Sequence, residues 1–348
     1  MFKVLLKTRN FIDKFAQKEL NDFFSVDCNV LGEGLYEVIF EDRDDMISFV
    51  YNLMFYSRCF ERAFLKICEF NDLSGVGDME LDFIDKEFSF EVDARDDYKG
   101  DKKEAERVFG SLICRIDNLN VDLHDPDLSF KVFSRDGKSY LGIDLLGFDL
   151  SKRDFKINVN YATINSLISV YGLYLLGIDK EKNYSIIDPC AQIGDLIIEA
   201  SLFNLRKALN VKKRLHTCVY KIFGSSSKVP LRVEDKNKYY GVVQNNKNFK
   251  LIKENMSFCN SKAKISKYDL DWLDVKYKRD EVDYLIVQIP MIKDEEEYYK
   301  FLEDFFYQAE FIVKKRFVVI SKKKIDDGYY KNYDSLLLEK FENLVVGE

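Results

Sequence analysis

With 348 residues, the chain is long enough for two or three domains and a large hydrophobic core. Hydrophobic residues make up 47% of the chain and charged residues 32%, a balance typical of globular rather than disordered or membrane proteins. The formal net charge is −7, which does not attract nucleic acid, so any RNA binding must come from local basic patches.

Several other classes of protein are disfavoured. No apolar run reaches about 18 residues, and Lys3, Lys7 and Arg9 interrupt the first apolar residues. We therefore expect a cytoplasmic protein with no transmembrane helix, no signal peptide and no membrane partner. The seven cysteines form no C-x-x-C pair and are expected to be reduced thiols. His124 and His216 lie too far apart for a typical zinc site, so no metal site is predicted.

The first 72 residues alternate the patterns of strand and helix. Apolar runs predict strands over residues 2–8, 34–40 and 62–68, and helical spacing predicts helices over 10–24 and 42–53. This order suggests a ferredoxin-like unit, an α+β arrangement that by itself indicates no activity.

Residues 73–150 continue with a second α+β pattern. Phe88–Ala94 alternates apolar and polar residues, as a half-buried strand does. Asp101 and Glu104 have the spacing of a capping box, and a helical stripe of apolar residues follows them. A strand and turn are predicted over 121–127. Further on, Arg135-Asp136-Gly137-Lys138 separates two apolar-alternating runs and predicts a hairpin.

The remainder of the chain, residues 161–348, alternates strands with helices, which predicts a parallel, doubly wound α/β sheet. Residues 210–235 interrupt this pattern and are predicted to be an insertion or loop. The predicted helices cover residues 163–177, 196–209, 247–258 and 295–313, and the predicted strands cover 184–187, 239–243, 263–268, 282–287, 317–320 and 341–346.

One stretch organises this region. Residues 184–203 read as a buried strand that ends at Asp188-Pro189, a short loop with Gly194, and an amphipathic helix that starts at Asp195. Corners of this kind bind nucleotides at the carboxyl edge of a doubly wound sheet. Asp195 is expected to cap the helix rather than hold a ligand.

This stretch resembles the first motif of the Rossmann-fold methyltransferases that use S-adenosylmethionine. In the RNA-modifying branch that motif contains Asp-Pro, two nearby glycines, a threonine and then Glu-Ala. Gln192 stands where the family has its first glycine, and we expect it to disfavour the positive φ that glycine permits. The matching residues are Asp188, Pro189, Gly194, Glu199 and Ala200.

The N-terminal half resembles a THUMP domain preceded by a ferredoxin-like unit. The resemblance rests on VDLHDPDLSFKVF (121–133) and on Gly-Ile-Asp-Leu-x-Gly (142–147), and residues 151–160 resemble the usual link into a methyltransferase domain. In this order the whole chain resembles the THUMP-containing tRNA guanine-N2 methyltransferases. The resemblance implies a ferredoxin-like domain (1–72), a THUMP domain (73–150), a linker (151–160) and a methyltransferase domain (161–348). It also implies binding to the acceptor stem and 3′ end of tRNA.

The resemblance further assigns cofactor and catalytic positions. Its cofactor-binding residues here would be Asp188, Gln192, Gly194, Gln244 and Asp269. Its catalytic Asn-Pro-Pro-aromatic motif corresponds to Gln288, Ile289, Pro290 and Met291. Gln244 lacks the charge that an acidic residue offers the ribose hydroxyls, and Met291 stacks a base less well than a ring.

Basic residues of the THUMP-like region and the linker are the candidate RNA contacts. Tyr98, Phe133 and Tyr140 lie among them and are predicted to stack on single-stranded bases. Lys212–Arg214 and Lys322–Lys324 form further basic clusters. The candidate RNA-binding residues are Arg95, Lys99, Lys102, Lys103, Arg135, Lys138, Lys152 and Arg153.

Three functions remain open at this point. The first is a tRNA-binding protein with a methyltransferase fold that has lost or weakened its S-adenosylmethionine-dependent activity and that needs no cofactor. The second is a divergent but active tRNA guanine-N2 methyltransferase that uses S-adenosylmethionine. The third is a non-catalytic scaffold that binds a protein partner. The first function is favoured because Gln192, Gln244 and the segment 288–291 all depart from the residues of the family.

Overall fold

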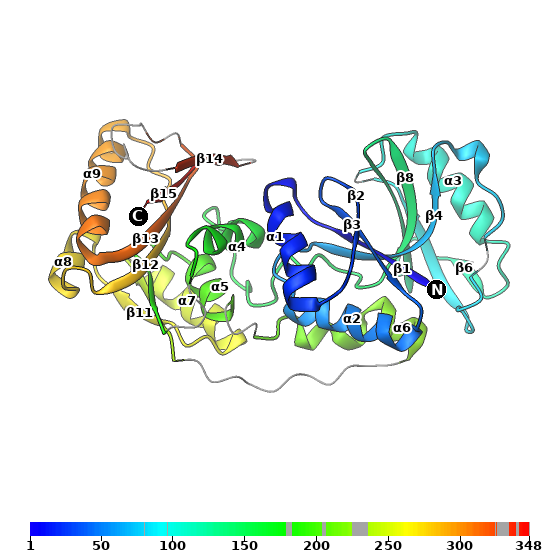
Figure 1. Cartoon of the computed structure of the whole chain (residues 1–348), viewed down its shortest axis with the longest axis horizontal. Helices are drawn as coiled ribbons and strands as arrows, with labels where there is room; N and C mark the ends of the chain where they lie inside the picture. Colours follow the sequence, from blue (N-terminus) through cyan, green and yellow to red (C-terminus); the bar gives the residue numbers. More distant parts are fainter. Residues whose placement is uncertain are drawn as a thin grey trace. The chain divides into compact units, whose positions relative to one another are not determined.

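The computed structural model describes residues 1–79, 81–95, 97–178, 183–203, 207–224, 236–323 and 325, and the backbone of 334–338 and 341–347. The chain divides into two compact units (Figure 1). Met1–Ser151 and Asn210–Pro230 form the first unit, and Lys152–Leu209 and Leu231–Glu348 form the second.

The first unit is built on one eight-stranded sheet with the order β2-β3-β1-β4-β8-β7-β5-β6. Its first four strands and the helices between them follow the β-α-β-β-α-β succession of a ferredoxin-like fold, as predicted. Residues 73–150 extend the same sheet. The strands are β1 (Phe2–Lys7), β2 (Asn29–Gly32), β3 (Leu35–Phe40), β4 (Arg62–Phe70), β5 (Phe88–Asp93), β6 (Leu119–Val121), β7 (Leu128–Arg135) and β8 (Lys138–Asp144).

Local signals explain most helices and turns of this unit. Asp42 caps α2 (Arg43–Tyr56), and Asp101 caps α3 (Lys102–Ile113) by accepting a bond from the N–H of Glu104. The β7–β8 hairpin turns at Asp136 and Gly137, which both have positive φ. The helical segment predicted over 10–24 consists of a 3-10 turn (Asn10–Ile12), α1 (Asp13–Lys18) and a π-helical turn (Glu19–Phe24); a further 3-10 turn spans Leu73–Gly75.

The interrupting segment predicted over 210–235 belongs in part to the first unit. Its described residues form a 3-10 helix (Val211–His216) and α6 (Cys218–Phe223), whereas residues 225–235, with the serine run, lie outside the described residues. The Asn210 side chain donates to the carbonyl of Met54 at 3.3 Å, and the N–H of Val219 donates to the carbonyl of Leu145 at 2.9 Å. These bonds fix the segment to α2 and to the end of β8.

The second unit has a seven-stranded sheet with the order β11-β10-β9-β12-β13-β15-β14. The first five strands in that order are parallel, and β15 runs antiparallel to both of its neighbours. Strand β14 is absent from the sequence prediction. The strands are β9 (Ser185–Asp188), β10 (Lys238–Val243), β11 (Lys264–Lys267), β12 (Val282–Gln288), β13 (Val313–Ser321), β14 (Asp334–Leu338) and β15 (Phe341–Gly347).

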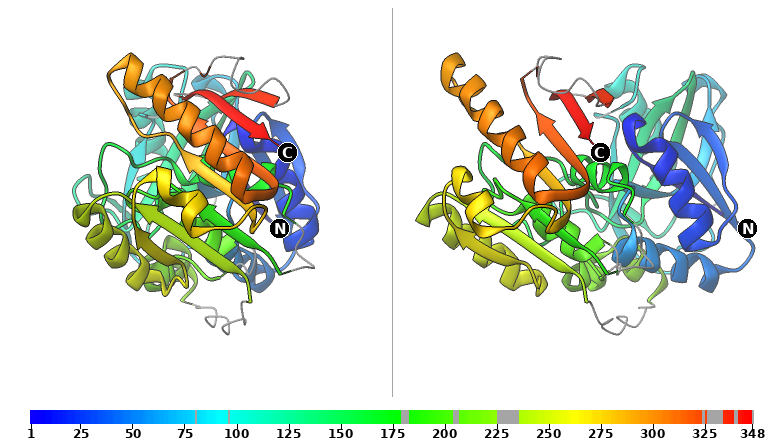
Figure 2. Two further views of the ribbon diagram at one scale, coloured as in Figure 1. Left: turned by 90° about the vertical axis from the view of Figure 1, so that its left-hand side faces the viewer. Right: turned by 60° about the vertical axis from the view of Figure 1, so that its left-hand side comes forward.

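Helices cover both faces of this sheet, as an all-parallel core requires. Leu285 and Val287 of β12 pack with α9, which crosses one face of the sheet (Figure 2). Ile286 points to the other face, where α4 comes so near that a Cβ added to Gly172 would lie 3.0 Å from Ile286 Cδ1. The helices are α4 (Ser166–Leu175), α5 (Asp195–Phe203), α7 (Asn246–Cys259), α8 (Leu273–Lys276) and α9 (Glu295–Ile312), with a 3-10 turn at Leu270–Trp272.

The end of helix α5 differs from the sequence prediction. Helix α5 ends at Phe203 instead of reaching residue 209, and residues 207–209 after the undescribed 204–206 are not helical.

None of the helices in the described part of the chain combines the length and apolar composition that a membrane span requires. The predicted α/β and α+β fold class is confirmed, with a Rossmann-like, doubly wound sheet in the second unit.

Candidate functional site

The candidate site lies at the carboxyl edge of the second unit's sheet. The strand order reverses between β9 and β12, and ligands of doubly wound folds bind outside the carboxyl ends of the strands at such a point. Strands β9 and β12 end there at Asp188 and Gln288, and Gln244 directly follows β10. Asp269 follows β11 and is exposed. The structure therefore brings the predicted cofactor and catalytic positions to one edge.

The loop after β9 turns back sharply on itself. The N–H of Ala191 donates to the carbonyl of Val242 at 2.8 Å, and the N–H of Gly194 donates to the carbonyl of Ala191 at 2.5 Å. Gln192 adopts a positive φ of 46° even though its side chain disfavours this conformation. Such a conformation costs a residue with a side chain about 1–2 kcal/mol, and the surrounding hydrogen bonds hold it in place.

Gly194 is required by packing within the protein. Its φ is 93°, and an added Cβ would lie 2.6 Å from the Cγ1 atom of Ile252 on α7. Asn255, from the same helix, donates to the carbonyl of Ile193 at 3.1 Å. The glycine that matches the nucleotide-binding motif thus brings the loop against α7, and its α-carbon faces a side chain of the protein.

The two carboxyl groups of this loop are both buried. Burial, and to a lesser degree the nearby charge of Asp195, raises the pKa of Asp188 to about 8, so Asp188 is neutral at pH 7. Asp195 is the first residue of α5 and accepts a bond from the N–H of Ile164 at 3.1 Å. It also forms an ion pair with Lys156 at 3.0 Å. The prediction that Asp195 caps its helix is therefore wrong, because its carboxylate turns towards residues outside α5.

Little space remains beside this loop. A cavity of about 10 Å³ is lined by Asp188, Gln192, Asp195 and Gln288, among others, and such a volume holds roughly one water molecule. The side chain of Gln244, where the family has its ribose-binding acid, donates to the carbonyl of Pro189 at 3.3 Å. The residues of this loop do not fit an adenosyl cofactor, because Gly194 packs against Ile252, Asp188 is neutral and Asp195 is ion-paired with Lys156.

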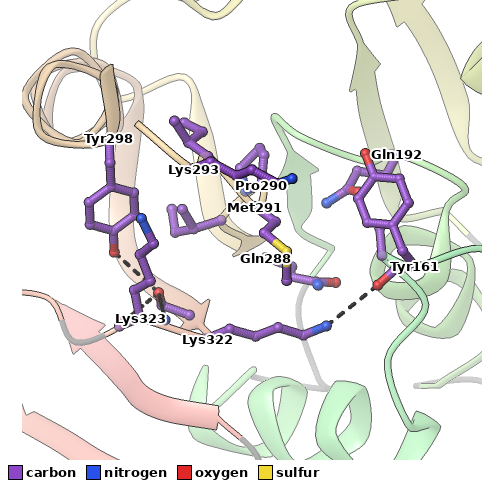
Figure 3. Close-up of a pocket in the computed structure, with 13 residues that line it drawn as sticks. Tyr161, Gln192, Gln288, Pro290, Met291, Lys293, Tyr298, Lys322 and Lys323 are labelled. Atoms are coloured by element: carbon purple, nitrogen blue, oxygen red, sulfur yellow. Dashed lines mark hydrogen bonds between the residues drawn. The ribbon is translucent and has the colours of Figure 1, made fainter. Parts of the chain in front are cut away.

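A larger cavity of about 330 Å³ opens next to it, beyond the ends of β12 and β13 (Figure 3). Gln288 lies in its wall with 8% of its surface exposed, and Met291 is 57% exposed. Lys322 donates to the carbonyl of Tyr161 at 3.4 Å. The lining residues are Tyr161, Ala162, Gln192, Gln288, Ile289, Pro290, Met291, Ile292, Lys293, Tyr298, Ser321, Lys322 and Lys323.

Two amide groups of this cavity have no hydrogen-bond partner within the described residues. They are the buried Nε2 atom of Gln192 and the side-chain amide of Gln288. Buried polar groups normally have partners, so these two amides are available to a ligand that can both donate and accept.

The sequence prediction missed some residues of this cavity. Tyr161 belongs to the irregular segment before α4, and nothing in the local pattern marks it. Ser321 ends β13, and the rule that ligands bind at the carboxyl ends of strands would have found it. Lys322 and Lys323 were singled out only as a basic cluster, and Lys324 lies outside the described residues.

Several of the predicted RNA contacts are excluded by burial. Arg153 is 3% exposed and forms an ion pair with Glu199 at 3.2 Å, so its assignment as an RNA contact is wrong. Tyr98, Phe133 and Tyr140 are also buried, and the last two stack on each other with ring centroids 5.6 Å apart. These rings cannot stack on bases, because the rest of the protein covers them. The sequence pattern did not show whether each ring would lie inside the protein or on its surface.

The remaining basic candidates differ in their surroundings. Lys99, Lys102 and Lys103 are exposed near the start of α3, and no ion pair is recorded for them among the described residues. Lys152 is likewise exposed. Arg135 is half-buried. Arg95 and Lys138 are exposed but already form ion pairs: Arg95 with Asp93 at 2.8 Å, and Lys138 with Glu69 at 2.6 Å.

Within the part of the chain that the structure describes, no group of three or more His, Cys, Asp or Glu side chains is arranged to hold a metal ion.

Comparisons with known proteins agree with this architecture. No family model matches the chain. It is similar to the ribosomal RNA large subunit methyltransferase K/L of Buchnera aphidicola, with 24% identity over 230 residues, which are 60% of this chain and 31% of that protein. The chain therefore spans about a third of that relative.

Two solved structures resemble the whole chain. TrmN from Thermus thermophilus superposes with a TM-score of 0.68 and 15% sequence identity, over 99% of both chains. SMU.472, determined in complex with S-adenosylhomocysteine, gives a TM-score of 0.73 at 13% identity, over 99% of this chain and 97% of that one. The chain thus has the fold of these two proteins.

Proposed function

We propose that this protein binds tRNA and has lost, or greatly weakened, the binding of S-adenosylmethionine in its methyltransferase fold. The observation that supports the proposal is the loop after β9, where Asp188 and Asp195 line a cavity of only about 10 Å³. The cofactor carries a sulfonium and an ammonium group, both cationic. Asp188 is neutral and Asp195 is paired with Lys156, so neither offers a free negative charge.

The RNA-binding part of the proposal is assigned to the first unit. We propose that residues 73–150 act as a THUMP domain together with the ferredoxin-like domain 1–72, and that residues 151–160 link them to the methyltransferase fold. Three exposed lysines near the start of α3 support this assignment: Lys99, Lys102 and Lys103. The proposed target is the acceptor stem and 3′ end of tRNA.

Calorimetric titration of the full chain with S-adenosylmethionine tests the proposal. We expect no heat of binding at micromolar cofactor, whereas tRNA should bind with an affinity that falls steeply as salt rises. A tRNA that lacks its single-stranded 3′ end is the matched control and should bind more weakly. Micromolar binding of the cofactor would overturn the proposed loss, and equal binding of the truncated tRNA would overturn the proposed target.

A second candidate is a divergent, active tRNA guanine-N2 methyltransferase. The observation that favours it is the side-chain amide of Gln288, which is buried beside the larger cavity and has no protein partner in the described part of the chain. Such an amide can accept a hydrogen bond from a guanine amino group. Methyl transfer from labelled cofactor to tRNA guanine, abolished in Gln288→Ala, would establish this function in place of the first.

A further inference from the structure

Helix α7 and strand β11 form a basic face of the second unit. Strand β11 is the first strand in the order of the seven-stranded sheet, α7 packs against it, and Lys267 donates to the side chain of Asn246 at 2.9 Å. From residue 245 to residue 268 the sequence has a single acidic residue, Glu254. The exposed lysines of this basic face, for which no ion pair is recorded among the described residues, are Lys247, Lys250, Lys253, Lys262, Lys264 and Lys267.

Helix α9 forms an acidic face of the same unit. Its inner side is apolar, with Leu302, Phe305 and Ala309 buried, and Lys300 is its only basic residue. The exposed acidic residues of this acidic face, for which no ion pair is recorded within the described chain, are Glu295, Glu296, Glu297, Glu303 and Asp304. Tyr307 lies one helical turn beyond Glu303 and is 62% exposed, so an aromatic ring belongs to the same face.

The two faces lie on opposite sides of the sheet. Val242 of β10 packs in the same apolar cluster as α9. The preceding Gly241 faces the other way, because an added Cβ would lie 3.3 Å from Ile197 of α5. Helix α7 is on that second side, where Ile252 packs on Gly194 at the start of α5. Figure 1 shows the strands between α9 and α7, so a single copy cannot bring its two faces together.

We propose that copies of this protein associate head to tail, with the acidic face of one copy against the basic face of the next. Surfaces of opposite charge attract each other and favour one orientation of docking. Because the two faces of a copy point in opposite directions, each copy can contact two others. The contact is therefore heterologous, and association continues past a dimer. The proposal requires neither tRNA binding nor the loss of the cofactor site.

Tyr307 gives this contact an apolar centre. Aromatic residues are enriched in the core of protein interfaces, where charged residues are depleted. A tyrosine ring also attracts lysine ammonium groups, as the ring of Phe249 does on the basic face, where the Nζ atom of Lys253 lies 5.5 Å from its centroid. A lysine of a neighbouring copy can approach Tyr307 in the same way, because most of that side chain is open to solvent.

Nucleic acid is the other partner that exposed lysines attract. The basic face alone would suit its phosphates, but the acidic face would repel them. The two faces carry similar numbers of opposite charges, six lysines against five carboxylates. A second copy matches both faces, whereas a polyanion matches only one of them.

Sedimentation velocity of the full chain at low and at high salt tests the proposal. We expect species larger than a dimer at about 20 mM salt, growing with protein concentration, and monomer at about 500 mM, where the Debye length is below about 5 Å. A monomer at both salt concentrations, or association that stops at a dimer, would overturn the proposal.

Charge reversals identify the two faces. Lys250→Glu with Lys264→Glu reverses two charges of the basic face, and Glu296→Lys with Glu303→Lys reverses two charges of the acidic face. Each double variant alone should associate at least about tenfold more weakly, because attractions become repulsions. An equal mixture of the two should form complexes again, because the unchanged acidic face of the first meets the unchanged basic face of the second. If the mixture stays monomeric while both variants melt like the parent, the two faces do not contact each other.

The matched control is Lys14→Glu with Lys86→Glu, which changes the net charge equally at exposed positions of the first unit. Its association should equal that of the parent. An equal loss in this control would show that net charge governs association, and the proposal would be wrong. It would also be wrong if the Lys250 and Lys264 variant lost binding to single-stranded RNA but associated like the parent, because the basic face would then be a nucleic-acid surface.

Discussion

The loop after β9 and the segments after β12 and β13 lie at the same edge of one sheet, yet they differ in how their polar groups are used. Around the first loop, Asp195 pairs with Lys156 and Gln244 bonds to Pro189, whereas the buried Nε2 atom of Gln192 has no hydrogen-bond partner among the described residues. Beyond β12, the amide of Gln288 faces a cavity of about 330 Å³ without a partner in the described chain.

The difference shows that a fold fixes where a site lies but not whether the site can receive a ligand. Strand order brings both regions to the switch point. Hydrogen bonds and ion pairs from neighbouring segments then narrow one region, whereas the other keeps a cavity of about 330 Å³. Variants of both regions can test whether these contacts determine stability and ligand binding.

We expect the largest effect from breaking the ion pair between Arg153, which lies before α4, and Glu199 of α5. Arg153 and Glu199 are both fully buried at the side chain, with 3.2 Å between Nε and Oε2. Arg153→Met would remove the guanidinium from beside the buried carboxylate of Glu199, so we expect a loss of about 3–5 kcal/mol in the free energy of unfolding. Urea denaturation monitored by circular dichroism measures it.

Two further variants control this experiment. Lys152→Met changes the exposed neighbour and should alter stability by less than about 0.5 kcal/mol. Replacing both partners, Arg153→Met with Glu199→Met, should recover most of the lost stability because no charge is left buried. If the single variant is as stable as the parent, the pair does not hold the segment.

The second prediction concerns the neutral carboxyl of the closed loop. The pKa of Asp188 is raised to about 8 in the folded protein, whereas an unfolded aspartate ionises near pH 4. Between these values the unfolded state binds fewer protons, so this group lowers stability as pH rises from about 4 to 8. Asp188→Asn should remove that slope, by at most about 1.4 kcal/mol per pH unit.

Thermal unfolding of both proteins between pH 4 and pH 8 measures the slope. Asp283→Asn is the control and should leave the slope between pH 4 and pH 8 almost unchanged, because the contribution of Asp283 changes only below about pH 4. Although burial raises the pKa of Asp283, bonds from Ser185 and Lys315 hold it below its usual value. That carboxylate therefore stabilises the fold at neutral pH and loses its effect on acidification. Parallel pH curves for the parent and Asp188→Asn would contradict the neutral state of Asp188.

A smaller effect is expected at the exposed lysines of the first unit. Replacing Lys99, Lys102 and Lys103 together with glutamine should weaken tRNA binding by about tenfold and lower the slope of log K against log salt by roughly 2–3. Fluorescence anisotropy at several salt concentrations measures both quantities. An unchanged slope would show that these lysines do not contact phosphates.

The matched control removes the same charge from a helix of the second unit, and it should leave the salt slope unchanged. It carries the exposed α7 substitutions Lys247→Gln, Lys250→Gln and Lys253→Gln.

The sequence predicted the fold well because strand and helix periodicity is local. The alternation in Phe88–Ala94, the capping residue Asp101 and the Asp136-Gly137 turn each specify their element without help from the rest of the chain. The short strands β2 and β14 lack a comparable signal and were missed.

The state of the site could not be predicted in the same way, because it depends on contacts between distant residues. The ion pair of Lys156 with Asp195 joins positions that no spacing rule connects. Burial of Arg153 depends on its pairing with Glu199 in α5. Strand order correctly grouped the carboxyl-edge positions, whereas their hydrogen bonds and ion pairs became visible only in three dimensions.

The smallest effect is expected at Gln192. It distinguishes whether the side chain of Gln192 or the lack of a free carboxylate prevents cofactor binding at the loop after β9. Gln192 has φ 46°, so Gln192→Gly should relieve backbone strain and stabilise the protein by at most about 1 kcal/mol. If bulk alone closes the loop, this variant will also bind S-adenosylmethionine in a calorimetric titration. We expect it not to bind, because Asp188 stays neutral and Asp195 stays paired. Adding Lys156→Gln frees the carboxylate of Asp195, so a cofactor affinity that appears only in the double variant would identify charge as the cause.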